Sequence, residues 1–354
     1  MLHDFWNPLR EVHNPGFARV CDEIIQDWRP DIVHIHNFPG LSFDPIRLAK
    51  RAVANVIVSL HNYFPLCSRD DLFFADTTVC SGPTRASCSR CLGTMLGDDL
   101  YVQRYRAMVG LLNECDALLA VSSRVAELYI EHGVRPELLT VERIGSTTAE
   151  RLWREIGSSR SQSDVLPSTP LQVIFFGALL PRKGLMTLLQ AVRLVENPNL
   201  VAVHVFGGER EANIALYAQA LSIFPPANRA CVEFHGPFAQ TDLVEILKHM
   251  DIAVFTPRWE DSGPQTVMES LGAGLPVVCA PLGGVPDMII DGKNGIHVNE
   301  GDAQALARVI DDLAMNPERV IQLRRGITPP RSMEDHRQAL DDVYKSVKSG
   351  ARRA

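Results

Sequence analysis

Two neighbouring acidic residues stand where a predicted strand gives way to a predicted helix. Residues 255–276 read FTPRWEDSGPQTVMESLGAGLP, so Glu260 and Asp261 are followed directly by Ser262 and Gly263. Carboxylates at such a turn orient the hydroxyl groups of a ligand, and a glycine lets the backbone approach that ligand closely. The dipole of a helix N-terminus also favours acidic residues by itself, so the pair alone leaves a purely structural role open.

The helix that follows this turn has the features of a diphosphate site. A proline at position 264 suits its first turn, where the backbone amides near Gln265 and Thr266 have no partner within the helix. Such amides bind phosphate groups well. Glu269 lies further along the same apolar helix, where a lone carboxylate is costly. Because its two oxygens suit the two hydroxyls of a ribose, we expect a nucleotide there.

A second phosphate-binding signal comes from the segment VIFFGALLPRKG, residues 173–184. An apolar strand ends at Gly177, and Arg182 and Lys183 precede the next predicted helix. In a parallel sheet, ligands bind at the carboxyl ends of the strands, and cations beside a helix N-terminus suit a diphosphate. A solvated basic turn is the alternative for this segment taken alone.

The elements that position these residues form a repeating pattern along the chain. Short, nearly continuous apolar runs alternate with amphipathic stretches, which is typical of parallel sheets covered by helices on both faces. We therefore predict an α/β protein with doubly wound parallel sheets. The predicted strands are residues 31–36, 56–61, 117–122, 171–177, 200–206, 232–235, 252–256 and 276–279.

The chain is long enough for two domains, because 354 residues at roughly 150 per domain give about two. Residues 157–170, GSSRSQSDVLPSTP, lack periodicity and are interpreted as a linker between them. We therefore expect a first domain at 1–165 and a second, ligand-binding domain at 166–330. The remaining stretch, 331–354, is expected to hold a helix that is able to pack back on the first domain.

Four of the eight cysteines cluster in one aperiodic insertion, residues 62–100, which is too long for an ordinary connection. They are spaced as Cys67-x12-Cys80-x7-Cys88-x2-Cys91. Four thiols suit a closed, structural zinc site. Unligated thiols and disulfides are the alternatives, because the spacing is irregular.

Composition limits the location and partners of the chain. The net charge of −7 argues against broad nucleic-acid binding. No run of about 18 apolar residues and no signal-peptide pattern is visible, so we expect a cytoplasmic protein. Peripheral contact with the inner membrane surface and association with a partner subunit remain open, since no basic amphipathic helix decides them.

The order and spacing of these motifs resemble group 1 glycosyltransferases, which have the GT-B fold of two Rossmann-like domains. In the second half, the matching pieces are GALLPRKG, VFGGER, VEFHGPF, TPRWEDSGPQTVMESLGAGLPVV, GGVPD and DGKNGIHV. In the first half they are PDIVHIHN, VSLHNY and ALLAVSSRV. The resemblance covers about residues 20–345.

The resemblance implies a retaining transfer of sugar from a nucleotide-diphosphate sugar, with no metal in the chemistry. By position, Lys183 matches the diphosphate-binding lysine and Glu269 the ribose-binding glutamate. Asp261 falls where the first acid of the paired motif is expected, although its neighbour Glu260 makes the register ambiguous. His61 matches a histidine that approaches the donor sugar from the first domain.

Three departures from the family pattern bear on activity. Ala178 stands where members often carry an arginine, and Asp261 replaces a glutamate. The first domain looks truncated, because no amino-terminal strand with a Gly-rich loop precedes residue 31. The main alternative is therefore a catalytically impaired subunit that binds nucleotide sugar, and a non-hydrolysing epimerase of the same fold is a third hypothesis. The acceptor (a glycan, a lipid-linked molecule or a small molecule) is not specified by these motifs.

Overall fold

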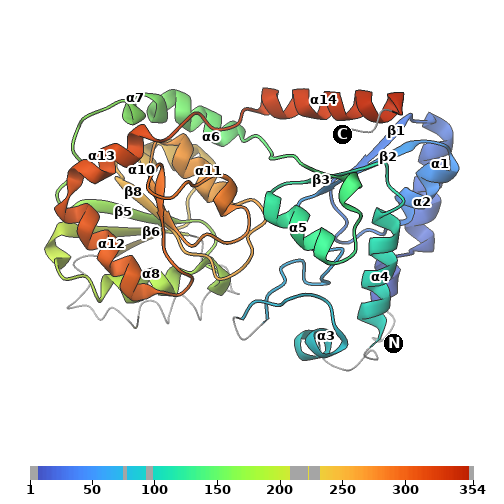
Figure 1. Ribbon diagram of the computed structural model, residues 1–354, viewed down its shortest axis with the longest axis horizontal. Helices are drawn as coiled ribbons and strands as arrows, with labels where there is room; N and C mark the ends of the chain where they lie inside the picture. The colour runs from blue at the N-terminus through green and yellow to red at the C-terminus, as the bar shows by residue number, and fades with distance from the viewer. Residues whose placement is uncertain (1–6, 75–77, 93–98, 208–221, 223–231, 351–354) are drawn as a thin grey trace. The chain divides into compact units, whose positions relative to one another are not determined.

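The structure of the chain is a computed structural model that describes residues 7–74, 78–92, 99–207, 222 and 232–350. The chain folds into two compact units (Figure 1). The first contains residues 1–144 and 334–354, and the second contains residues 145–333. The predicted α/β class with parallel sheets is confirmed in both units.

The first unit is built on four parallel strands in the order β1-β2-β3-β4. Val56 and Val58 of β2 point into one apolar core, while Ile57 between them points into another, because side chains alternate along a strand. Val343 of the last helix packs on that second face against Ile57. The strands are β1 (Ile32–Ile35), β2 (Asn55–Leu60), β3 (Ala117–Ala120) and β4 (Leu139–Val141). The helices are α1 (Pro15–Trp28), α2 (Asp44–Arg51), α3 (Arg85–Leu92), α4 (Leu100–Leu112), α5 (Ser123–Glu131) and α14 (Met333–Ser349).

The second unit has six parallel strands in the order β10-β9-β8-β5-β6-β7. Helices cover both faces of this sheet, with α8, α12 and α13 on one apolar core and α6, α10 and α11 on the other. The strands are β5 (Leu171–Phe176), β6 (Val201–Phe206), β7 (Val232–Gly236), β8 (Ile252–Phe255), β9 (Val277–Cys279) and β10 (Gly295–His297). The helices are α6 (Thr147–Leu152), α7 (Ser158–Ser161), α8 (Leu185–Val192), α10 (Leu243–Leu247), α11 (Gln265–Gly272), α12 (Ala303–Met315) and α13 (Pro317–Arg325).

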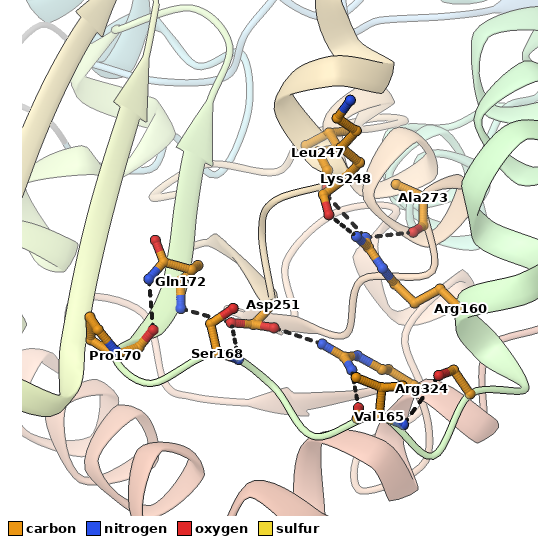
Figure 2. Close-up of polar contacts among 11 residues, drawn as sticks. Arg160, Val165, Ser168, Pro170, Gln172, Leu247, Lys248, Asp251, Ala273 and Arg324 are labelled. Carbon is orange, nitrogen blue, oxygen red and sulfur yellow. Dashed lines mark hydrogen bonds and ion pairs between the residues drawn. The ribbon is translucent and has the colours of Figure 1, made fainter.

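The predicted linker at 157–170 belongs to the second unit, and the division falls after Ile144 instead of near residue 165. Arg160 donates hydrogen bonds to the carbonyls of Leu247, Lys248 and Ala273 (Figure 2). Burial lowers the pKa of the Arg160 guanidinium to about 10. The segment lacks periodicity because polar contacts with neighbouring loops, more than an apolar stripe, fix it in place.

A buried ion pair secures the end of the same segment (Figure 2). Arg324 donates to Asp251 at 2.9 Å and also to the carbonyl of Val165. The other oxygen of Asp251 accepts the backbone N–H groups of Ser168 and Gln172, each at 3.0 Å. The two buried charges therefore offset each other, as stability requires, while the Arg324 Nε is buried without a hydrogen-bond partner among the described residues.

The cysteine-containing insertion has more local structure than its aperiodic sequence predicted. Helix α3 lies within it, and an isolated antiparallel bridge joins Phe73 to Val79. Residues 75–77 and 93–98 of the insertion lie outside the described part of the chain. None of the helices described has the length and apolar character needed to cross a membrane.

Candidate functional site

The loop after β5 is held against the end of β8, and this places Arg182 and Lys183. Gly184 has φ +83°, and a Cβ atom at this position would lie 1.6 Å from the carbonyl oxygen of Thr256. The Thr256 hydroxyl donates to the Gly184 carbonyl at 3.1 Å, and the Arg258 amide donates to the Arg182 carbonyl at 2.8 Å. A glycine is therefore required after Lys183 for the two loops to touch.

Lys183 pairs with Asp261, so the two loops bring these residues together. The Lys183 Nζ lies 2.5 Å from the Asp261 Oδ2, with 22% of the lysine and 7% of the aspartate side chain exposed. The cations of Arg182 and Lys183 both lie over the ring of Trp259. The Arg182 Cζ is 4.9 Å from the ring centroid, and the Lys183 Nζ is 5.3 Å from it. The loop thus concentrates positive charge beside a buried carboxylate.

The two neighbouring acids have different surroundings. The Glu260 carboxylate accepts the backbone N–H of Gly283 at 2.8 Å. The Asp261 carbonyl accepts the N–H of Gly284 at 2.7 Å, while its carboxylate faces Lys183. Gly283 has φ +60°, and a Cβ there would lie 2.1 Å from the Asp261 carbonyl oxygen. Glu260 thereby fastens the loop, and Asp261 is the acid paired with the cation.

Helix α11 presents an uncapped first turn beside the end of β5. Its N-cap is Pro264, whose side chain makes no capping hydrogen bond, and the amides of Gln265 and Thr266 in the first turn lack an intrahelical acceptor. Gly177 has φ +120°, and a Cβ there would lie 3.1 Å from the Thr266 side chain. The predicted phosphate-binding elements, one from each loop, therefore adjoin each other.

Glu269 is a largely buried residue whose carboxylate accepts no hydrogen bond from the described residues. The residue is 7% exposed, its neighbours Val267 and Ser270 are buried, and burial raises the pKa of its carboxyl to about 7. Throughout the described residues, no group donates a hydrogen bond to this carboxylate. A carboxylate in such enclosed surroundings is costly, so its retention points to a ligand that supplies hydrogen-bond donors.

His61 lies in the first unit, directly after β2. Its Nε2 is 3.2 Å from the Nδ1 of His36, and burial, with smaller contributions from His36 and His336, lowers its pKa. Neighbouring His34 is held by the Tyr344 hydroxyl at 2.8 Å and the Ser59 hydroxyl at 2.9 Å. The contribution of α14 to this cluster was not predicted from the sequence. Tyr344 and His34 are 310 positions apart, and no local pattern links them.

The four clustered cysteines line one small cavity of about 20 Å³ in the first unit. All four thiols are free, yet no three of these sulfur atoms lie within 4.8 Å of one another in the described residues. Burial raises the pKa of the Cys67 thiol, while the backbone N–H groups of Arg69, Leu72 and Asp71 act in the opposite direction. The fold thus gathers the thiols without closing them to ligand distance.

One of two further predicted features lies partly outside the described residues. Gly208, Glu209 and Arg210 of the VFGGER motif lie outside the described residues. Ser262 and Gly263 occupy the turn between β8 and α11, as the sequence indicated.

Two family models match the chain over most of its length. The model described as glycosyl transferases group 1 matches residues 159–327, and the model described as glycosyltransferase family 4 matches residues 2–142. A D-inositol 3-phosphate glycosyltransferase of Streptomyces avermitilis is 30% identical over 199 residues, which are 53% of this chain and 42% of the relative. A glycogen synthase of Mycobacterium tuberculosis is 24% identical over 332 residues, which are 92% of this chain and 71% of the relative. The chain spans about half the length of the Streptomyces relatives that it matches.

Two solved structures have a similar fold. HepE of Anabaena, crystallised in complex with UDP, superposes with a TM-score of 0.70 at 19% identity over 94% of this chain and 82% of its own. Sucrose-phosphate synthase of Thermosynechococcus elongatus gives a TM-score of 0.67 at 15% identity over 95% of this chain and 78% of its own. Both parallel-sheet units are therefore those of the GT-B fold, and the chain belongs to the group 1 glycosyltransferases.

Proposed function

We propose that this chain is a glycosyltransferase that moves a sugar from a nucleoside diphosphate sugar to an acceptor. The observation that carries the proposal is the Glu269 carboxylate, which is buried and lacks a hydrogen-bond donor among the described residues. A ribose supplies two such donors in one ligand. The uncapped first turn of the same helix supports a diphosphate attached to that ribose.

Lys183 and Arg182 suit the diphosphate end of the donor. Their charges lie beside Trp259 and at the end of β5, where ligands bind in parallel sheets. In the free protein, Asp261 neutralises Lys183. We propose that the diphosphate replaces Asp261 as the ion-pair partner of Lys183, so that Asp261 is able to accept hydrogen bonds from the sugar.

The reaction we propose breaks the bond between the sugar carbon and the diphosphate oxygen. The bonding electrons leave with the diphosphate, and Lys183, Arg182 and the amides of α11 stabilise the charge that develops there. The acceptor hydroxyl attacks from the same face and passes its proton to the departing diphosphate, so the anomeric configuration is retained. His61 belongs to the proposed sugar-binding set, from the first unit. No side-chain nucleophile and no metal is needed for these steps.

The donor that we would test first carries uridine, because two solved relatives are complexes of HepE with UDP and with UDP-glucose. The experiment incubates the full chain with UDP-, GDP- or ADP-glucose and a panel of glycan, lipid-linked and small-molecule acceptors. Mass spectrometry detects the product, and NMR of its anomeric proton tests retention. A glycosylated product that Lys183→Met abolishes supports transfer. Donor binding without any product supports the alternative of a nucleotide-sugar-binding subunit, and an epimerised donor contradicts both.

We also propose that Cys67, Cys80, Cys88 and Cys91 hold a structural zinc ion. The support is the shared cavity and the preference of zinc for four thiolates in closed sites. The full chain is expected to contain zinc after dialysis, and Cys88→Ser with Cys91→Ser is expected to remove it. Zinc-free protein with four freely titratable thiols would contradict this site.

A cytoplasmic location is part of the proposal. The seven described cysteines are free, as is typical of proteins kept in a reducing compartment. Contact with a membrane surface or a partner subunit is a further outcome that the acceptor panel and a vesicle-binding assay would reveal.

A further inference from the structure

Two histidines and a glutamate meet on one face of the sheet in the second unit. His204 lies on β6, and Glu233 and His235 lie on the neighbouring strand β7. His204 pairs with Glu233 in the parallel register, so their side chains share a face. The pairing register shifts at His235, and its Nε2 lies 3.7 Å from the Glu233 Oε2, so its side chain reaches the same face. None of the motifs used for the donor site includes these three residues together.

The tautomer of His204 is set by a chain of hydrogen bonds behind it. The Gln172 side-chain N–H donates to the Pro170 carbonyl at 2.6 Å, which fixes the orientation of the amide (Figure 2). Its oxygen therefore faces the His204 Nε2 at 2.8 Å and accepts the proton of that nitrogen. The other nitrogen, Nδ1, is left with a lone pair that faces His235 and Glu233. A partner that holds the outer nitrogen of a histidine in this way is typical of metal ligands.

The separations among the three ligand atoms match a metal ion. The His204 Nδ1 lies 2.9 Å from the His235 Nε2, and the Glu233 Oε2 lies 3.8 Å from the first and 3.7 Å from the second. The point equidistant from these three atoms is about 2.0 Å from each, which equals the usual length of about 2.0–2.2 Å for bonds from zinc to nitrogen or oxygen. The ring of Phe206 stacks on His235 with centroids 4.1 Å apart and fixes its plane.

The three side chains differ in their exposure to solvent, as expected for a metal site that a water molecule is able to enter. The side chains of His204 and His235 are 16% and 25% exposed, whereas that of Glu233 is 67% exposed. The two imidazoles are therefore largely enclosed, and the carboxylate is accessible from solvent.

We propose that His204, Glu233 and His235 bind one divalent transition-metal ion such as zinc, with water in the remaining position. Two imidazoles and one carboxylate are a ligand set that zinc accepts. The ion joins the edge strand β7 to β6. This site is separate from the proposed cysteine site and does not depend on glycosyl transfer.

The test uses the full chain with Cys88→Ser and Cys91→Ser, so that zinc bound by the cysteine site does not contribute. Calorimetry with zinc chloride is expected to show one site, and His235→Gln is expected to weaken it at least about 100-fold. Gln172→Leu keeps all three ligands and is expected to weaken binding about 10- to 100-fold, because the tautomer is no longer fixed. His249→Gln, an exposed histidine of the same unit, is the matched control and is expected to bind as the parent does.

Cobalt binding gives a second readout, which does not require that the chain with the two cysteine substitutions folds. In the chain with all its cysteines, cobalt bound by nitrogen and oxygen contributes one part of the ligand-field absorption, which His235→Gln removes, and cobalt bound by the cysteines contributes another part, which this variant keeps. Thiolate charge-transfer bands from the cysteine site remain as an internal reference. Unchanged zinc affinity and unchanged ligand-field bands in His235→Gln would overturn the proposal, as would a parent chain that binds no zinc at this site.

Discussion

The Glu269 carboxyl predicts an unusual dependence of stability on pH. Its ordinary pKa is 4.5, and burial raises it to about 7. The folded chain therefore binds this proton more tightly than the unfolded chain does. Consequently, the carboxyl lowers the free energy of unfolding progressively as the pH rises from 4.5 to about 7, and its cost is complete above that pH.

The substitution Glu269→Gln removes this titration and nearly preserves the shape of the side chain. At about 1.4 kcal/mol per pKa unit, the cost of ionising Glu269 grows by about 2 kcal/mol between roughly pH 5.5 and 8.5. The variant should therefore gain about 2 kcal/mol of stability relative to the parent over that range. The comparison concerns the change in the stability difference between variant and parent over this pH range, so any effect of the amide that is independent of pH cancels.

Urea unfolding of both proteins at several pH values measures the gain. Glu155→Gln changes an exposed carboxylate of the same unit, so its stability should follow that of the parent within about 0.5 kcal/mol at every pH. If parent and Glu269→Gln show the same pH dependence, the Glu269 carboxyl is solvated or paired in the folded state, and the reasoning about an unsatisfied buried acid is refuted.

Three other changes test the same structure. Because an ionised Glu269 is needed to accept the ribose hydroxyls, UDP should bind about tenfold more weakly at about pH 6 than at pH 8, and calorimetry should show that Glu269→Gln lacks this part of the dependence. Lys183→Met should lower the free energy of unfolding, measured with urea, by about 2–4 kcal/mol because it leaves the buried Asp261 unpaired. Adding Asp261→Asn to this variant should restore most of that stability without restoring UDP binding. An equal loss of stability in the single and the double variant would contradict the pairing. Asp251→Ala should cost about 3–5 kcal/mol because Arg324 loses its partner, and a loss below about 1 kcal/mol would show that this ion pair is not structural.

Much of the sheet architecture was predictable because buried parallel strands have a strong apolar signature. Each of the eight predicted strands is present, with ends that differ by no more than two residues. The strands at Leu139–Val141 and Gly295–His297 were missed, since three residues are too few for a periodic signal. The segment at 157–170 was misread as a linker, because its Ser- and Pro-rich composition conceals contacts such as those of Arg160 with distant carbonyls.

The candidate donor site was predictable where its residues lie in short loops at strand ends. Lys183 and Asp261 are 78 positions apart in sequence, and their loops meet because β5 and β8 are neighbours in the sheet, which the sequence did not specify. Sequence left the roles of Glu260 and Asp261 ambiguous, because adjacent residues in a loop point in directions that only the backbone hydrogen bonds to Gly283 and Gly284 determine. The cluster around His204 gave no sequence signal, since its geometry depends on a pairing register between strands that are far apart in the chain.

Calorimetric titration of the full chain with UDP, GDP and ADP tests the central claim most directly, because it asks whether the second unit binds a nucleoside diphosphate through Glu269. One diphosphate is expected to bind with a stoichiometry near one. Glu269→Gln should weaken it by about 1–3 kcal/mol, as for loss of a buried hydrogen-bond acceptor, while Glu155→Gln binds as the parent does. Binding of none of the three, or equal binding by Glu269→Gln and the parent, would contradict the claim.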